Sequence, residues 1–355
     1  MSVGTFFKTF SNSDRTTTRT LLHESIPITG TLAKGTYNSS AQSDGVSREQ
    51  NIKTFSHAMF QSVYDYPHLS SSANHIFDIT AGFSTVSSVS SSARIHVNVL
   101  GAKKVNMYNQ MAQALVGYDT NNLIRRFDQD GDLSGGNKHD EVVFLNFSRL
   151  LVKDEIKKGS FSLQLGGNPN DATPFSGNQL VTISDSNAAT NTKVNSPAGE
   201  YGILISGSTN VGLVYYQAGI AVLGKSAFKN GTSDSDMTPS GSLVHSMASS
   251  SINQIADAVR NRIHNISFSN TTELNSSIYF CRASHNEFNY SSNPTYLSGS
   301  KIIVKDDDIE TPPRSYITTV GLYSADNELM AVAKLSEPLK KTPDNEVTLR
   351  VRLDY

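Results

Sequence analysis

The chain has 355 residues, a formal net charge of -2, 17% charged residues and one cysteine. The near-neutral charge gives no electrostatic support for nucleic-acid binding, and one cysteine excludes a disulfide framework or a four-cysteine zinc site within the chain. No window approaches the roughly 18 consecutive apolar residues of a membrane-spanning helix, and the abundant Ser, Thr and Asn favour β-rich surfaces.

The first third of the chain predicts an extended segment followed by short mixed elements. Residues 1–50 are polar and predict an arm that is ordered by a neighbouring chain. Residues 52–64 have the pattern of a short helix, and apolar alternation predicts a strand over 94–100. Apolar spacing of three and four residues predicts a helix over 104–116, and Gly117 is expected to end it.

The middle of the chain alternates short apolar runs with turn-forming residues, which is typical of antiparallel β structure. The expected strands are 141–152, 161–165, 179–183, 201–205, 212–216 and 220–223. The last two flank a Gln-Ala-Gly turn and predict a hairpin. An apolar face that follows three serines predicts a helix over 250–265.

The last eighty residues show the clearest β pattern. Strands are expected over 278–283, 316–323 and 328–335, with a hairpin turn at 324–327. The final ten residues alternate apolar and polar side chains, so we expect a half-buried strand whose end is held in a sheet.

These elements predict a mainly β (α+β) fold. We expect antiparallel, sandwich-like sheets with a few helices and an extended N-terminal arm. The predicted division is an arm over 1–50, a β-rich central region over 51–276, and a C-terminal antiparallel β unit over 277–355.

Residues 219–226 match the phosphate-binding expression G-x-x-x-x-G-K-[ST] letter by letter. That motif needs a loop of backbone amides between a strand and a helix. Here the middle residues, Ile-Ala-Val-Leu, favour a strand, and the residues after Ser226 cannot sustain a helix. We interpret the match as chance and expect no nucleotide cofactor.

Asp128, Asp130 and Asp132 place carboxylates at alternating positions, as calcium-binding loops do at their start. However, Leu133 stands where such a loop needs glycine, and His139 stands where it needs a bidentate glutamate. The three aspartates are the chain's metal candidate. The alternative, an acidic turn before a strand, requires no metal.

Cys281 lies four residues before His285, which suggests a thiol nucleophile with its base. Cys281 also lies within an expected strand and lacks the surroundings of a cysteine protease. We predict a small buried hydrophobic residue instead. Since the other histidines are scattered and no nucleophile-elbow motif occurs, we predict no enzymatic activity and no cofactor.

The stretch EFNYSSNPTY, residues 287–296, sets three aromatic residues among small polar ones. Its Asn-Pro pair stops a helix and keeps the chain extended or turned. We expect a structural clasp or an interface here, supported by two tyrosines from the strands that follow. The residues assigned to it are Phe288, Tyr290, Asn293, Pro294, Tyr296, Tyr323 and Tyr355.

Three C-terminal blocks, at 286–295, 317–338 and 347–355, closely resemble the end of a virion structural protein of T4-like marine myoviruses, including those of cyanobacteria. Those proteins carry N-E-F-N-Y-S-x-N-P-T-F, then ITTVGLY-x-x-x-x-E-L-[LM]-AVAKLS-x-P-[LI]-K, then an alternating strand that ends in Asp and an aromatic residue. The likeness is looser over 142–165 and 201–223.

This resemblance implies a structural subunit of a virion, similar to a wedge protein of contractile-tail baseplates. It implies assembly in the host cytoplasm, other tail subunits as partners, and a homo-oligomer, with a dimer as one form. From composition we expect no nucleic-acid or membrane partner. The alternatives are a neck or collar component, and a receptor- or glycan-binding attachment module.

Overall fold

The computed structural model is mainly β, with 44% of residues in strands and 20% in helices, which confirms the predicted fold class. No helix within the described ranges is both long and apolar enough to cross a membrane. The structure describes residues 7–36, 49–89, 99–168, 170, 173–229, 242–291, 294, 297–298, 301–302 and 314–355.

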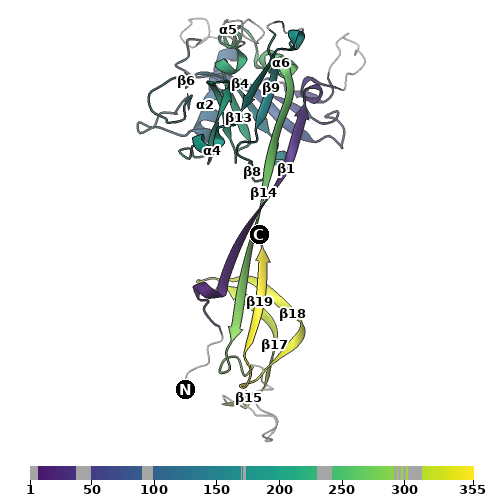
Figure 1. Cartoon of the computed structure of the whole chain (residues 1–355), viewed down its shortest axis with the longest axis vertical. Coiled ribbons are helices and arrows are strands. Elements are labelled where there is room, and N and C mark those ends of the chain that lie inside the picture. The colour runs from purple at the N-terminus through teal and green to yellow at the C-terminus, as the bar shows by residue number, and fades with distance from the viewer. Residues whose placement is uncertain are drawn as a thin grey trace. The chain divides into compact units, whose positions relative to one another are not determined.

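The chain forms two compact units (Figure 1). The central unit is Leu22–Thr272, and the terminal unit combines Met1–Leu21 with Glu273–Tyr355. Two long strands, β1 (Arg15–Thr29) and β14 (Ile263–Ala283), contribute residues to both units. The three-part division made from the sequence pattern stays a prediction, because it concerns segments of the chain and not packed units.

One large sheet contains most of the strands of the central unit. Its strand order is β1-β14-β9-β10-β11-β12-β13-β7-β4-β3-β2, and β8 and β19 also pair with β14. The bounds not yet given are β2 (Ile52–Thr54), β3 (Gln61–Tyr64), β4 (His75–Phe83), β7 (Glu141–Phe147), β8 (Glu155–Ile156), β9 (Ser162–Gly166), β10 (Leu180–Ser184), β11 (Tyr201–Ser206), β12 (Thr209–Tyr215), β13 (Ile220–Gly224) and β19 (Val347–Asp354).

Helices and short sheets complete the described elements. The helices are α1 (Gly30–Lys34), α2 (Val99–Leu115), α3 (Arg149–Val152), α4 (Ala188–Asn191), α5 (Leu243–Ser249) and α6 (Ile252–Arg262), with 3-10 turns η1 (Asn12–Asp14), η2 (Ser176–Asn178) and η3 (Lys225–Phe228). The two-stranded sheets are β5 (Phe127–Asp128) with β6 (Lys138–His139), β15 (Leu297–Ser298) with β16 (Lys301–Ile302), and β17 (Ser315–Tyr323) with β18 (Leu329–Lys341).

The core of the central unit lies on both faces of the large sheet. Successive side chains of a strand point to opposite faces, and in β7 Val143 and Leu145 join one buried cluster while Val142 and Phe144 join another. Strand β13 divides in the same way, with Leu223 in the first cluster and Val222 in the second. Continuous apolar runs such as Val-Val-Phe-Leu therefore mark strands buried on both sides.

Several predicted elements differ from the observed ones. The helix predicted over 52–64 is wrong, because these residues form β2 and β3, and Val63 pairs with Ile52 on one side and with Phe77 on the other. The strand predicted over 141–152 ends at Phe147, where its pairing with β4 ends, and α3 follows.

Two further boundaries are corrected. Residues 94–98 of the strand predicted over 94–100 lie outside the described residues, and Val99 already begins α2. The helix predicted over 250–265 ends at Arg262, since Ile263 pairs with Leu165 at the start of β14. The hairpin of β12 and β13, the hairpin of β17 and β18, and the paired final strand are confirmed.

Candidate functional sites

The terminal unit buries few apolar side chains. Among its described residues, only Ala283, Leu322 and Val351 are buried hydrophobic residues, and neither core cluster includes any of them. Most of its other described large apolar side chains are either half-buried or exposed. The exposed ones are Phe7, Phe10, Leu21, Leu274, Tyr316, Tyr323, Leu329, Met330, Val332 and Tyr355. Contiguous exposed apolar patches are typical of interaction sites, so this unit is the candidate for one.

The densest part of this surface lies at the turn end of the hairpin formed by β17 and β18. Gly321 pairs with Val332 and Tyr323 pairs with Leu329, so these residues share one face, while Leu322 and Ala331 face the other side. Tyr323 is 61% exposed, Leu329 53%, Met330 69% and Val332 51%. We call Tyr323, Leu329, Met330 and Val332 the apolar hairpin patch.

The structure describes only part of segment 287–296, which was predicted to be a structural clasp or an interface. Phe288 and Tyr290 are half-buried and Pro294 is exposed, whereas Asn293 and Tyr296 lie outside the described residues. Phe288 has a φ of +55°, in the left-handed region that disfavours a bulky side chain. Its carbonyl oxygen accepts a hydrogen bond from the Ser315 hydroxyl at 2.5 Å.

Two lysines hold the neighbouring residues of this segment. The buried ammonium of Lys341 donates to Asn289 Oδ1 at 2.7 Å and to the His285 carbonyl oxygen at 3.3 Å. Lys8 Nζ donates to Glu287 Oε2 at 2.8 Å. The segment is thus fixed by contacts with β17, β18 and the N-terminal residues. An interface role for Tyr323 and Tyr355, which are both exposed, stays a prediction.

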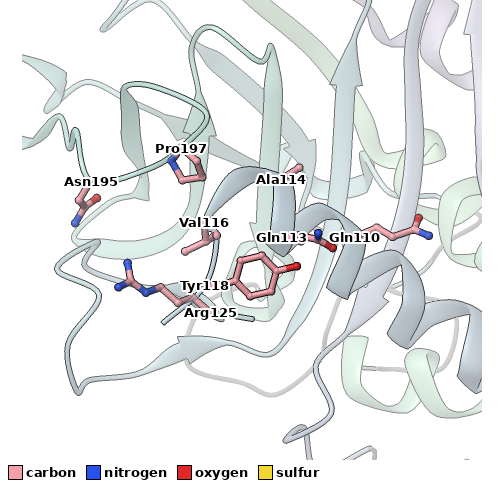
Figure 2. Close-up of a pocket in the computed structure, with 9 residues that line it drawn as sticks. Gln110, Gln113, Ala114, Val116, Tyr118, Arg125, Asn195 and Pro197 are labelled. Atoms are coloured by element: carbon pink, nitrogen blue, oxygen red, sulfur yellow. The ribbon is translucent and has the colours of Figure 1, made fainter. Parts of the chain in front are cut away.

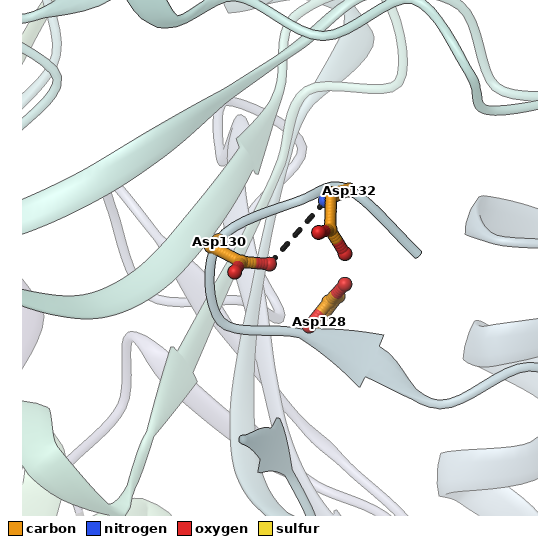
Figure 3. A group of neighbouring side chains, drawn as sticks. All are labelled: Asp128, Asp130 and Asp132. Atoms are coloured by element: carbon orange, nitrogen blue, oxygen red, sulfur yellow. Dashed lines mark hydrogen bonds between the residues drawn. The ribbon is translucent and has the colours of Figure 1, made fainter. Parts of the chain in front are cut away.

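Asp128, Asp130 and Asp132 lie together, with candidate ligand atoms within 4.8 Å of one another (Figure 3). Asp128 is buried, and its Oδ1 lies 2.8 Å from Lys138 Nζ. Its Oδ2 accepts a hydrogen bond from the Leu133 amide at 2.6 Å.

The other two carboxylates also bond to amides of their own turn. Asp130 Oδ1 accepts from the Asp132 amide at 3.4 Å, and Asp132 Oδ1 accepts from the Ser134 amide at 2.7 Å. Burial raises the pKa of Asp128, while the amide of Ser134 lowers that of Asp132. The amides of the turn and the Lys138 ammonium therefore account for this cluster without a metal ion, and calcium binding stays a prediction.

The match to the phosphate-binding expression falls on a paired strand. Ile220–Gly224 is β13, whose residue Leu223 lies opposite Val143 of β7 and Gly212 of β12. Lys225 begins a 3-10 turn, and its Nζ is 3.8 Å from Glu141 Oε2. The amides of the middle residues are therefore not free to wrap a phosphate, which confirms that these residues form a strand.

Cys281 and His285 are placed in different surroundings. Cys281 is half-buried in β14 opposite Leu349, and burial raises the pKa of its thiol. His285 is exposed beyond the end of the strand, with its Nδ1 3.6 Å from Glu346 Oε1. A raised thiol pKa disfavours the nucleophilic thiolate, and it agrees with a packing role for Cys281.

A surface cavity of about 610 Å³ lies at the C-terminal end of α2, and no sequence pattern predicted it (Figure 2). Its polar lining consists of glutamine, asparagine, tyrosine and arginine side chains, which are common on any surface and form no local motif. Only the fold brings α2 together with the segments around residues 118, 125 and 196. The lining residues are Gln110, Gln113, Ala114, Val116, Gly117, Tyr118, Arg125, Asn195 and Pro197.

No family model, curated protein or solved structure matches this chain.

Proposed function

We propose that this protein is a structural subunit that assembles with other protein chains and has no catalytic role. The terminal unit carries this proposal, because its described residues bury only three apolar side chains and expose many large ones. A domain as small as the terminal unit must bury most of its apolar surface to be stable. A partner that covers the apolar hairpin patch supplies the burial that the unit lacks by itself.

The free edge of β1 supports the same role. Strand β1 stands at the end of the strand order, and β14 is its only neighbour among the described strands. Its 15 residues are almost all exposed. Exposed strand edges present unpaired backbone groups to which another chain can add a strand.

We further propose that the assembly is a bacteriophage virion, with the tail baseplate as the location and the neck or collar as the alternative. The C-terminal blocks that resemble myovirus structural proteins all fall in the terminal unit. The block 317–338 contains the whole apolar hairpin patch, and 347–355 contains β19. The resemblance is thus concentrated in the terminal unit, which exposes large apolar side chains.

A complementation experiment tests this function. A phage that lacks the gene would be supplied with the wild-type chain or with the Met330→Asp, Val332→Asp double variant. The variant is expected to fold, because both side chains are exposed, but to fail to enter particles. Leu69→Asp and Leu150→Asp are matched controls in the central unit, since both residues are also exposed.

The outcome is read from purified particles by mass spectrometry and negative-stain images. Incorporation of the two controls and loss of the double variant support the proposal. Complete, contractile tails in particles that lack this chain would overturn it.

A further inference from the structure

The lining of the cavity at the end of α2 includes a positively charged side chain. Arg125 is half-buried in its lining, and its guanidinium has no ion pair or hydrogen bond to any residue that the structure describes. The adjacent Arg126 differs, since its Nη1 lies 3.0 Å from Asp140 Oδ1. An arginine fork matches a carboxylate in charge and geometry, so Arg125 is suited to an anionic group of a ligand.

The end of α2 also leaves hydrogen-bond acceptors open. The last carbonyl groups of a helix have no partner within it. Here the Ala112 oxygen accepts from the Val116 and Gly117 amides, and the Leu115 oxygen accepts from the Ser196 hydroxyl. The carbonyl oxygens of Gln113 and Ala114 accept no hydrogen bond from described residues beyond α2, and both residues line the cavity. A ligand with hydroxyl donors would satisfy them.

An aromatic ring and an oriented amide complete the lining. Tyr118 is 48% exposed and presents its ring beside the buried Val116. Asn195 is held in place, because its Nδ2 donates to the Gly131 carbonyl at 3.0 Å and its Oδ1 accepts from the Tyr201 hydroxyl at 2.7 Å. The volume of about 610 Å³ lies within the roughly 300–1,000 Å³ usual for small-molecule sites.

We propose that this cavity binds a sugar that carries a carboxylate, such as a uronic acid. The carboxylate pairs with Arg125, the hydroxyl groups donate to the open carbonyl oxygens, and the apolar face of the sugar ring lies on Tyr118. A neutral sugar leaves Arg125 unpaired, and a simple carboxylate leaves the carbonyl oxygens and the tyrosine ring without partners. This site goes beyond the proposed assembly role and gives the chain a means of recognising an acidic polysaccharide.

Titration of the full-length protein with glucuronate, glucose and acetate, followed by NMR or calorimetry, tests the site. We expect saturable binding of glucuronate with a Kd on the order of 1 mM, and binding of glucose and acetate at least roughly tenfold weaker. Arg125→Gln should weaken glucuronate binding roughly ten- to hundredfold, because it removes a charge-assisted hydrogen bond. Tyr118→Ala should weaken the binding of the sugar without affecting the fold.

Arg149→Gln serves as the matched control, since Arg149 is exposed in the same unit and contacts the Gln217 carbonyl instead of the cavity. It should bind glucuronate like the wild type. The proposal is overturned if glucuronate shows no saturable binding, if glucose or acetate binds as tightly, or if Arg125→Gln binds unchanged. The variants of the apolar hairpin patch lie in the other unit and should retain binding, so failure here is distinct from failure of the assembly role.

Discussion

The ring of Tyr323 lies against Gly321, so closely that a Cβ added at residue 321 would be 3.0 Å from the ring atom Cε2. The glycine thus leaves the space that the tyrosine ring occupies within the apolar hairpin patch. Gly321→Ala should displace the exposed ring at little cost to stability, because the ring is at the end of a flexible side chain. We expect the thermal unfolding midpoint to change little and incorporation into particles to fall, as measured by calorimetry and particle mass spectrometry.

A contrasting glycine provides the control. A Cβ at Gly212 would lie 2.2 Å from the Val222 carbonyl oxygen, which belongs to the paired backbone of β13. Gly212→Ala should therefore destabilise the central unit itself. If Gly321→Ala lowered the unfolding midpoint as much as Gly212→Ala does, the Tyr323 ring would be part of the folded core and not of an interaction surface.

The clasp segment should depend on Lys341. Lys341→Met removes the hydrogen bonds to Asn289, His285 and Thr342, and it leaves the acceptors of the half-buried Asn289 and the buried Thr342 without a donor. We expect a loss of roughly 1–3 kcal/mol in the free energy of unfolding, measured in urea. Lys340→Met is the neighbouring control, because Lys340 is exposed, and it should change stability by less than about 0.5 kcal/mol.

Substitutions of Phe288 test whether the backbone conformation of the same segment is strained. Because its φ is +55°, Phe288→Gly should relieve roughly 1–2 kcal/mol of strain while it removes the packing of the half-buried ring, whereas Phe288→Ala should lose that packing and keep the strain. The glycine variant is expected to be the more stable of the two. A more stable alanine variant would show that the backbone conformation is not what constrains this position.

Stability should fall in mild acid because of His139. Burial lowers its pKa to about 4 from the ordinary 6.5, so the unfolded chain binds a proton between these values that the folded chain does not. The stabilisation is present above pH 6.5 and is lost as the pH falls toward 4, to an extent of at most roughly 3 kcal/mol. Urea unfolding of the wild type and of His139→Phe at pH 7 and 4.5 measures it, and equal losses would contradict the assignment.

Lys104 should make the free energy of unfolding depend on pH in the alkaline range. Its buried ammonium donates to the Met247 and Ser250 carbonyl oxygens, and burial lowers its pKa to about 8 from 10.5. The unfolded chain therefore binds more protons above pH 8, and stability should rise by roughly 2 kcal/mol between pH 8 and 9.5. Lys104→Met should lack this rise, and an identical rise in both proteins would contradict it.

Structural features that depend on residues close together in the chain could be predicted from the sequence. Turn residues and alternation predicted the hairpins of β12 with β13 and of β17 with β18, because a hairpin pairs neighbours along the chain. The helix predicted over 52–64 was wrong because Val63 lies between two strands, paired with Ile52 on one side and Phe77 on the other, and this pairing overrides the local helical pattern. The pairing of β13 with β7 joins residues 74 to 82 positions apart, and no local signal specifies it.

The candidate sites were also only partly predictable from the sequence. The aromatic segment around Phe288 was visible in the sequence, but its anchors, Ser315 and Lys341, lie on later strands. The cavity residues Gln110, Arg125 and Asn195 are unremarkable in type and distant in sequence, so only the folded chain brings them together. The exposure of the apolar hairpin patch was equally hidden, because alternation marks which residues share a face and not whether that face is covered.

A density map of the intact virion, with this chain traced, tests the assembly role most directly. We predict that the chain is found in the tail, with Tyr323, Leu329, Met330 and Val332 buried beneath a neighbouring subunit. A traced chain whose apolar hairpin patch faces solvent in the assembled particle, or a complete particle without the chain, would contradict the account.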